Sequence, residues 1–317
     1  MSGDTILVTG ATGLLGSEIV RLLPNAVGIS SSDCDLLSKD SLLDYIRGLN
    51  RHGRTIETVI HCAARVGGVK ANTDYVSDFF EDNITINSNV TSACFAKKIK
   101  LVSILSTCIY PDAPYVKYPL TEDQLHMGPP HSSNYGYAYA KRMLEVQSRA
   151  YRQQYGCNFV TVIPNNLYGP NDNFSLHSGH VIPALIRKIY EAKINNRPTV
   201  EVWGTGRAIR EFTLASDAAQ IILWIAETHN DNAPVNIGNT SSTSISDLAE
   251  LIASHVGFSG KIIFDKSKPE GQYEKPSSNQ KLKSLGWSKD YTPLSEGIRQ
   301  TANSFVSQYP NVRGISD

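Results

Sequence analysis

A tyrosine and a lysine four residues apart form the clearest chemical pattern in the sequence. Tyr137 and Lys141 lie in the segment NYGYAYAKRMLEV, which is expected to be helical, so both side chains fall on one helix face, about 6 Å apart. A lysine ammonium beside a phenol favours the phenolate and lowers a pKa that is otherwise near about 10. The pair is therefore predicted to exchange a proton with a substrate near neutral pH.

Ser106 is expected to complete this group from a distant part of the chain. It follows the apolar run LVSIL and ends the expected strand at 101–107, where its hydroxyl can hydrogen-bond a substrate carbonyl. A Tyr-x-x-x-Lys pair alone often occurs by chance, but here it follows a glycine-rich turn and a serine at a strand end. Tyr135 and Tyr139 have no lysine four residues later, so we interpret them as packing or substrate-facing residues.

Three glycines near the start of the chain predict a dinucleotide site. Gly10, Gly13 and Gly16 directly follow the run TILVT and open an expected helix. In such turns the first glycine allows the tight bend, the second lets the backbone approach a pyrophosphate, and the third lets the helix pack closely. The G-x-x-G-x-x-G spacing is typical of short-chain dehydrogenases. We assign Ala63, in the expected strand at 58–64, to the same cofactor site, together with Tyr137 and Lys141.

The residues after the second expected strand indicate which nicotinamide cofactor binds. NAD sites place a carboxylate there for the ribose 2′-hydroxyl, whereas this chain has Ser30, Ser31 and Ser32, with Asp33 only later. Without that carboxylate nothing repels a 2′-phosphate, so NADP is favoured and Ser31 is a candidate contact. No adjacent arginine or lysine supports the assignment, and a simple polar turn explains the serines equally well.

These candidate residues need a scaffold of alternating strands and helices. Short β-branched runs recur with helical stretches between them, which indicates right-handed βαβ units in an α/β fold, a Rossmann-type doubly wound parallel sheet. From about Asn165 the rhythm changes, with longer loops and an expected helix at 181–193. We predict a dinucleotide-binding domain at 1–167, with 211–232 packing back on it, and a smaller C-terminal α/β substrate domain at 168–317.

Composition narrows the function classes. The 317 residues include 30 basic and 30 acidic ones, so no strong charge suggests nucleic-acid binding. No apolar run reaches membrane-spanning length, and no basic leader precedes the first strand. The five cysteines show no C-x-x-C spacing, which favours neither a disulfide framework nor a metal site. We therefore expect a cytoplasmic protein with small-molecule chemistry.

Several segments carry a family resemblance over nearly the whole chain. GATGLLG, RVGGVKAN, LSTCIYP, YAYAK, NNLYGPNDNF, HVIPALIRK and VWGTGRAIREF resemble the extended short-chain dehydrogenase/reductases and, among them, the GDP-L-fucose synthase family. Cys108 and His180, in their contexts, single out this family. The resemblance implies a homodimer that uses NADPH to convert a GDP-linked 4-keto-6-deoxy sugar. Such enzymes invert C3 and C5 and then reduce the C4 ketone.

The resemblance also implies roles for individual residues. Inversion beside a ketone needs a base on one face of the ring and an acid on the other, and the family gives Cys108 the first role and His180 the second. A thiol becomes a usable base when nearby positive charge lowers its pKa. The resemblance implies that four further side chains contact the substrate: Asn166, Arg187, Arg210 and Trp203.

Departures from the family pattern leave the sugar open. The stretch 268–278, KPEGQYEKPSS, lacks the basic pair and acidic residue usual there, and Ala215-Ser216 replaces a more typical Val-Asp pair. A related GDP-linked keto sugar, such as a heptose, is therefore an alternative substrate. A 4,6-dehydratase fits less well, because Thr107-Cys108 stands where it needs carboxylate chemistry. A non-catalytic NADP-binding regulator is a further alternative, although such proteins typically lose the tyrosine or lysine.

Overall fold

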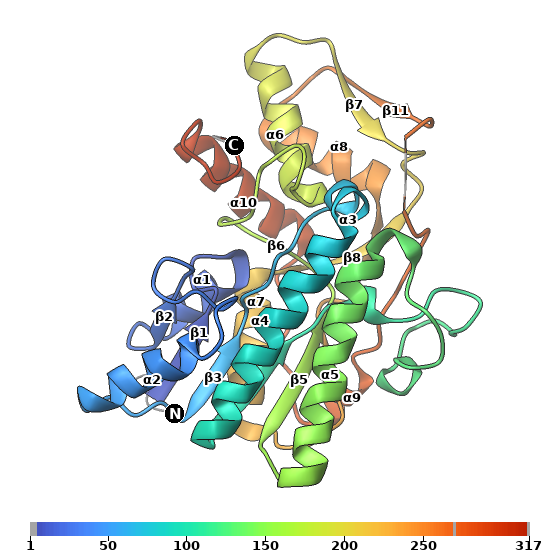
Figure 1. Ribbon diagram of the computed structural model, residues 1–317. Coiled ribbons are helices and arrows are strands. Elements are labelled where there is room, and N and C mark those ends of the chain that lie inside the picture. Colours follow the sequence, from blue (N-terminus) through green and yellow to red (C-terminus); the bar gives the residue numbers. More distant parts are fainter. Residues whose placement is uncertain (1–4, 269–270, 316–317) are drawn as a thin grey trace.

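A six-stranded parallel sheet forms the centre of the computed structural model, which describes residues 5–268 and 271–315. Its strand order is β2-β1-β3-β4-β5-β9, and this sheet confirms the predicted doubly wound α/β fold (Figure 1). The strands in chain order are β1 (Ile6–Thr9), β2 (Val27–Ile29), β3 (Thr58–His61), β4 (Lys100–Ile104), β5 (Phe159–Pro164) and β9 (Val235–Ile237).

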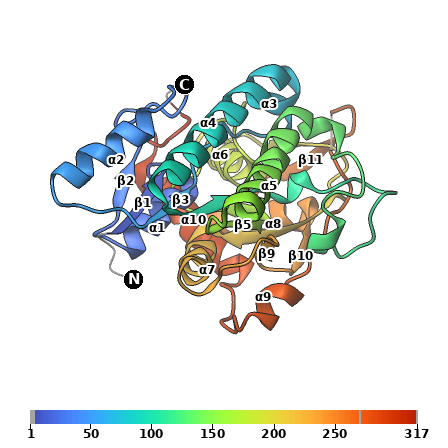
Figure 2. The same cartoon turned by 60° about the horizontal axis from the view of Figure 1, so that its bottom comes forward.

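Helices cover both faces of this sheet, which explains why its strands read as continuous apolar runs. On β1, Ile6 and Val8 face one buried cluster, while Leu7 between them faces another. Figure 2 shows α4 and α5 on one side of the sheet and α7 on the other. The helices are α1 (Leu14–Leu22), α2 (Ser41–Arg51), α3 (Val69–Asp74), α4 (Val76–Lys97), α5 (Tyr135–Tyr155), α7 (Ala215–Thr228) and α9 (Gln280–Ser284).

A second region lies beyond the carboxyl ends of the strands, above the sheet in Figure 1. It holds a three-stranded sheet in the order β10-β8-β6 and a pair, β11-β7. Its strands are β6 (Asn166–Tyr168), β7 (Thr199–Trp203), β8 (Ile209–Leu214), β10 (Ser242–Ser244) and β11 (Lys261–Asp265). Its helices are α6 (Val181–Ile194), α8 (Ile245–Val256) and α10 (Leu294–Gln308).

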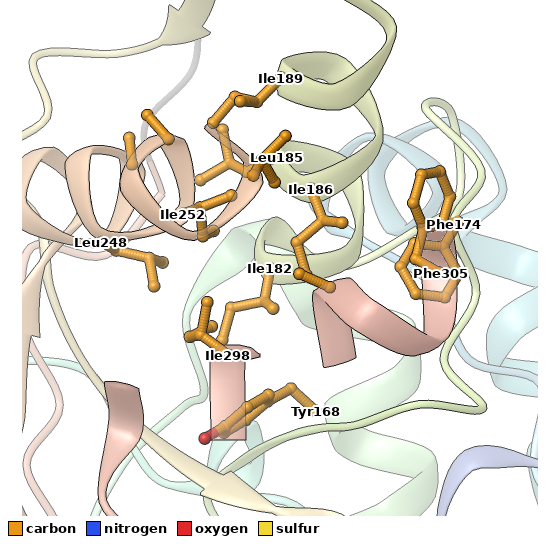
Figure 3. Packing of buried hydrophobic residues seen from close by; sticks show 14 of the residues in the cluster. Tyr168, Phe174, Ile182, Leu185, Ile186, Ile189, Leu248, Ile252, Ile298 and Phe305 are labelled. Carbon is orange, nitrogen blue, oxygen red and sulfur yellow. The ribbon is translucent and has the colours of Figure 1, made fainter. Parts of the chain in front are cut away.

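Helical periodicity builds the core of the second region. Ile182, Ile186 and Ile189 recur on one face of α6 and are buried against α8 and α10 (Figure 3). Phe174 and Phe305 stack with ring centroids 4.6 Å apart, which holds the loop before α6 against α10. This loop leads to His180, so the packed core fixes the backbone position of a candidate catalytic residue.

The chain returns from the second region to the first sheet. Helix α7 packs against α1, and its buried alanines and isoleucines join the cluster beneath β1 and β3. Strand β9 then adds to the sheet edge beside β5, and α9 contacts β9. Among the described residues, no helix is both long and apolar enough to cross a lipid bilayer.

The close packing of the glycine turn can be tested by its effect on the free energy of unfolding. A Cβ at Gly16 would lie 2.1 Å from the carbonyl oxygen of Gly10, so we expect Gly16→Ala to force the turn apart and to destabilise folding by about 1–3 kcal/mol. Gly48→Ala is the matched control, because nothing lies within 4 Å of its added Cβ inside α2. It should stabilise by about 0.5–1 kcal/mol. Urea unfolding measures both, and equal stabilities would contradict the close packing.

Candidate active site

A cavity of about 920 Å³ opens where the carboxyl ends of the parallel strands meet the second region. Ligands of open α/β sheets bind at this edge, and the volume is at the upper end of the range of about 300–1,000 Å³ for small-molecule sites. Most of the residues expected at the site line its wall: Gly10, Gly13, Gly16, Ser31, Ala63, Ser106, Tyr137, Lys141, Asn166, His180, Trp203 and Arg210. Cys108 and Arg187 do not.

The glycine turn forms a cradle for a ligand backbone. Gly10 has a φ of +66°, and a Cβ there would lie 2.8 Å from the amide nitrogen of Ala63. Helix α1 starts at Gly13 without a side-chain cap, so its leading amide groups are available to an anion. The turn therefore fits the pyrophosphate of a dinucleotide.

A buried polar chain beneath the turn was not predicted from the sequence. His61 Nδ1 lies 2.8 Å from Thr9 Oγ1, and His61 Nε2 lies 3.2 Å from Asn87 Oδ1. Burial lowers the pKa of His61 to about 3, so its ring is neutral. Thr9 Oγ1 also accepts the amide of Ala63, at 3.1 Å. The chain thus fixes the strand ends that carry the cofactor wall. The only sequence signal for this polar chain was the presence of polar residues within apolar runs.

The carboxylate of Asp33 is hydrogen-bonded within the serine turn, residues 30–33. This carboxylate accepts hydrogen bonds from the Ser30 amide at 2.8 Å and the Ser30 hydroxyl at 2.6 Å, which lower the pKa of Asp33. Ser31 lines the cavity, and within the described part of the chain its hydroxyl has no protein partner. Asp35 is a carboxylate on this wall that was not predicted. The structure leaves Ser31 as the hydroxyl available to a ligand.

Ser106, Tyr137 and Lys141 meet on the cavity wall although they come from different elements. Ser106 follows β4, and its hydroxyl accepts the amide of Cys108 at 3.4 Å, which caps a short 3₁₀ turn. Lys141 Nζ donates to the carbonyl of Ile104 at 2.9 Å and lies 6.0 Å from the centre of the Tyr137 ring. The α5 spacing thus brings both side chains to the end of β4.

The electrostatics of Tyr137 differ from the expectation that Lys141 lowers its pKa. Burial raises the pKa of Tyr137, and Cys108 raises it further. Burial also lowers the pKa of Lys141 to about 8, because its ammonium is removed from water. Enclosure therefore outweighs the attraction between the two groups, and the phenol keeps its proton in this state.

Cys108 is half-buried and packs against the cluster of Leu105, Ile109 and Tyr110. Burial raises the pKa of its thiol, whereas Lys275, a hydrogen bond from Ser106, and Lys141 lower it. The thiol is therefore neither sealed in the interior nor on the cavity wall itself. The cation that affects it most, Lys275, was not predicted from the sequence.

His180 is the N-cap residue directly before α6, and it lines the cavity. Enclosure by the cleft lowers the pKa of its imidazole, and Lys275 lowers it further. The amide of Gly68 donates to the carbonyl of Ser178 at 2.9 Å, and a Cβ on Gly68 would lie 2.7 Å from the Gly179 carbonyl oxygen. The RVGGVKAN segment thus braces the loop that carries His180.

The far end of the cavity gathers cations around an indole. Trp203 is 39% exposed, and the ammonium groups of Lys188 and Lys268 lie 5.6 and 6.0 Å from its ring centre. Arg210 donates to the carbonyl oxygens of Ile209, at 2.7 Å, and of residues 272 and 273. This wall can hold an aromatic base and a diphosphate.

Arg187 does not line this wall, unlike the other residues expected to contact the substrate. Its Nε donates to Glu191 at 2.9 Å, and its Nη1 donates to the carbonyls of Phe174, at 3.2 Å, and Gly314, at 2.8 Å. The amide of Phe174 also donates to the carbonyl of Arg313 at 3.0 Å. One helical residue turns the side-chain direction by about 100°. Lys188 therefore faces the cavity instead.

The structure also places Asn166, which was expected to contact the substrate, and the two segments that depart from the family pattern. Asn166 lines the cavity while its Nδ2 donates to the carbonyl of Glu211 at 2.7 Å. Ala215 and Ser216 start α7 and do not line the cavity. Of the stretch 268–278, residues 269–270 lie outside the described residues, Lys268 lies near Trp203, and Lys275 lowers the pKa of Cys108.

The sequence and the fold both match known proteins. The pattern of the NAD dependent epimerase/dehydratase family matches residues 6–238. The GDP-L-fucose synthase of Dictyostelium discoideum is 43% identical and aligns over 98% of each chain. A crystal structure of a GDP-L-fucose synthetase from Naegleria fowleri bound to NADP has a TM-score of 0.88 at 37% identity, covering 99% of this chain and 96% of that one. One of a GDP-6-OMe-4-keto-L-xylo-heptose reductase from C. jejuni has 0.87 at 27% identity, covering 97% and 99%.

Arg187 and Lys188 offer a matched pair of substitutions. Arg187→Met removes bonds to two carbonyls and leaves Glu191 unpaired, so it should destabilise folding by about 1–3 kcal/mol. Lys188→Met removes a cation from the cavity wall and should change stability by less than about 0.5 kcal/mol. Urea unfolding compares them, and an Arg187 variant as stable as the parent would contradict its structural role.

Proposed function

Because this chain belongs to the NAD dependent epimerase/dehydratase family and, within it, to the GDP-L-fucose synthases, we propose that it converts GDP-4-keto-6-deoxy-D-mannose to GDP-L-fucose. The conversion combines epimerisation at C3 and C5 with NADPH-dependent reduction of the C4 ketone. One observation carries the proposal: a single cavity joins the glycine turn to Ser106, Tyr137 and His180, with Cys108 two residues after Ser106 in sequence and its amide hydrogen-bonded to the Ser106 hydroxyl.

Epimerisation needs groups that act on opposite faces of the sugar. In the proposed step the thiolate of Cys108 takes the proton from the carbon beside the ketone, and the imidazolium of His180 gives one to the other face. The electrons left on carbon move into the C4 oxygen as an enolate and return when the new C–H bond forms. Ser106 and Tyr137 donate hydrogen bonds to that oxygen, where charge develops.

Reduction uses the same ketone oxygen. Bound NADPH supplies the hydride that C4 receives. Tyr137 gives its proton to the C4 oxygen, and the burial that raises its pKa ensures that this proton is present at the start. Lys141, held by the carbonyl of Ile104, places its charge beside the phenol as the proton leaves. One arrangement of donors thus serves both reactions.

The cofactor and the nucleotide occupy opposite ends of the proposed site. The pyrophosphate of NADP fits the uncapped start of α1, and Ser31 is the proposed contact for the 2′-phosphate. At the other end, Trp203 is proposed to pack on the guanosine, while Lys188 and Arg210 neutralise the diphosphate. Asn166 is proposed to hydrogen-bond the sugar.

The assembly and the compartment are also proposals. Helices α4 and α5 lie side by side with nothing covering them in Figure 1, and they expose Phe80, Met143 and Val146. We propose that this face packs on a second copy in a homodimer. All five cysteines are free thiols, which suits a reducing cytoplasm.

Product identification tests the reaction. With NADPH and GDP-4-keto-6-deoxy-D-mannose, NMR should identify GDP-L-fucose as the product. The heptose-reductase neighbour motivates a GDP-linked 4-keto-heptose as the competing substrate. Faster turnover of the heptose would replace the fucose assignment while keeping the reaction type. Binding of both sugars without turnover would favour a regulator.

Two variants separate the two half-reactions. Cys108→Ala should slow exchange of the C3 and C5 protons with deuterated water by about 10²–10⁴-fold, because it removes the proposed base. Tyr137→Phe should slow NADPH oxidation by a similar factor, because it removes the proton donor. Cys108→Ala should still bind NADP normally by fluorescence titration. Undiminished exchange in the cysteine variant would reveal another base, and normal reduction by the phenylalanine variant would reveal another acid.

A further inference from the structure

The carboxyl-terminal turn, residues 310–315, brings an arginine to the wall of the active-site cavity. Arg313 lines this cavity and is exposed. Its two neighbours in sequence are packed into the protein: Val312 is buried in the core of the second region, and a Cβ on Gly314 would lie 2.1 Å from Asn173 Oδ1. The backbone at Arg313 is therefore fixed beside the cavity.

Hydrogen bonds connect this turn to the cofactor end of the cavity. The amide of Phe174 donates to the carbonyl of Arg313 at 3.0 Å. Three residues earlier in the same segment, Asn171 Nδ2 donates to Ser17 Oγ at 3.0 Å. Ser17 lies in the first turn of α1, whose leading amide groups form the proposed pyrophosphate site. The segment that holds Arg313 therefore rests on the start of α1.

Arg313 differs from the other cations of the cavity wall in having no protein partner. Within the described part of the chain, no hydrogen bond, ion pair or aromatic ring holds its guanidinium. The other cations that line the wall are bonded to carboxylates or to main-chain carbonyls: Arg65, Lys70, Lys141, Lys188 and Arg210. The guanidinium of Arg313 thus keeps its N–H donors for a ligand.

A buried carboxyl group in the same segment has an oxygen without a donor. Asp172 lines the cavity and is 3% exposed, and its Oδ1 accepts the amide of Asn173 at 2.7 Å. Its Oδ2 has no partner among the described residues. Burial raises the pKa of Asp172 to about 7, while the Asn173 amide and the charge of Arg313 lower it. A guanidinium can bond a carboxylate and a phosphate at once, through different N–H groups.

The first region supplies little positive charge for the phosphates of the cofactor. The start of α1 contributes about half an elementary charge. The serine turn offers hydroxyl groups but ends in the carboxylate of Asp33, and Asp35 adds another carboxylate to the wall. A planar guanidinium from the second region offsets this deficit and matches the geometry of phosphate oxygens.

We propose that Arg313 binds the pyrophosphate of NADP at the start of α1, and that Asp172 positions its guanidinium. This inference rests on the proposed function for the placement of the cofactor, and it deepens that function by adding a cofactor-binding residue from the second region. The positive charge of Arg313 then lies between two negative groups. Cofactor binding thereby ties the carboxyl-terminal turn to the first sheet.

Arg313→Met tests this contact, with Arg299→Met as the matched control. Arg299 is an exposed arginine on α10, paired with Glu296 outside the cavity. Calorimetric titration of the full chain, without sugar, measures the Kd of NADP and of NAD. Arg313→Met should raise both Kd values by about 10–100-fold, because both cofactors carry the pyrophosphate. Arg299→Met should leave both near the parent values, and Arg313→Lys should give an intermediate loss.

Three results would overturn the proposal. An unchanged Kd for both cofactors in Arg313→Met would remove the contact altogether. A loss confined to NADP would assign Arg313 to the 2′-phosphate, and weaker binding of GDP with normal binding of NADP would assign it to the substrate diphosphate. Since Arg313 has no protein partner, its variants should keep the urea midpoint of the parent. Failure of the parent to bind NADP would refute the proposed function itself.

Asp172→Asn tests the positioning role through a double-mutant cycle. The substitution removes a negative charge near the proposed phosphate site, so a simple charge effect would tighten NADP binding. Positioning predicts the opposite: the Kd should rise by about 3–10-fold in the parent chain and should not rise further in the Arg313→Met background. Tighter binding, or the same loss in both backgrounds, would contradict the role of Asp172.

Discussion

Removal of water from charged groups governs the chemistry of this cleft. Enclosure raises the pKa of Tyr137 and Cys108 and lowers that of Lys141 and His180, so each group is pushed toward its neutral form. A neutral phenol suits a proton donor, but a neutral thiol does not suit a base. Lys275, from a segment remote in sequence, opposes the effect of burial on the pKa of Cys108.

The two regions of the fold are both required to build the site. The first sheet presents the glycine turn and Ser106, and α5 adds Tyr137, while the second region contributes His180. Contacts between them use small residues: Gly68 approaches the loop at Gly179 so closely that a side chain would collide. A reaction that needs groups on both faces of a sugar thus depends on packing between two separate cores.

Local patterns predicted much of this arrangement. The continuous apolar runs identified the strands because both sheet faces are covered, and the glycine spacing located the turn because each glycine has a steric reason. Long-range placement was not predictable in this way. Arg187 and Lys188 are neighbours, and only the direction of α6 determines which one faces the cavity. Lys275 lies in an irregular segment without periodicity, so it gave no local signal. His61 was marked only as a polar residue within an apolar run.

The bonds from Arg187 to Gly314 and from Phe174 to Arg313 tie the last described turn of the chain to the loop before α6. That loop ends at His180, so the last described residues brace the loop that carries this histidine. Anyone trimming the protein for crystallisation at residue 310 would remove this brace.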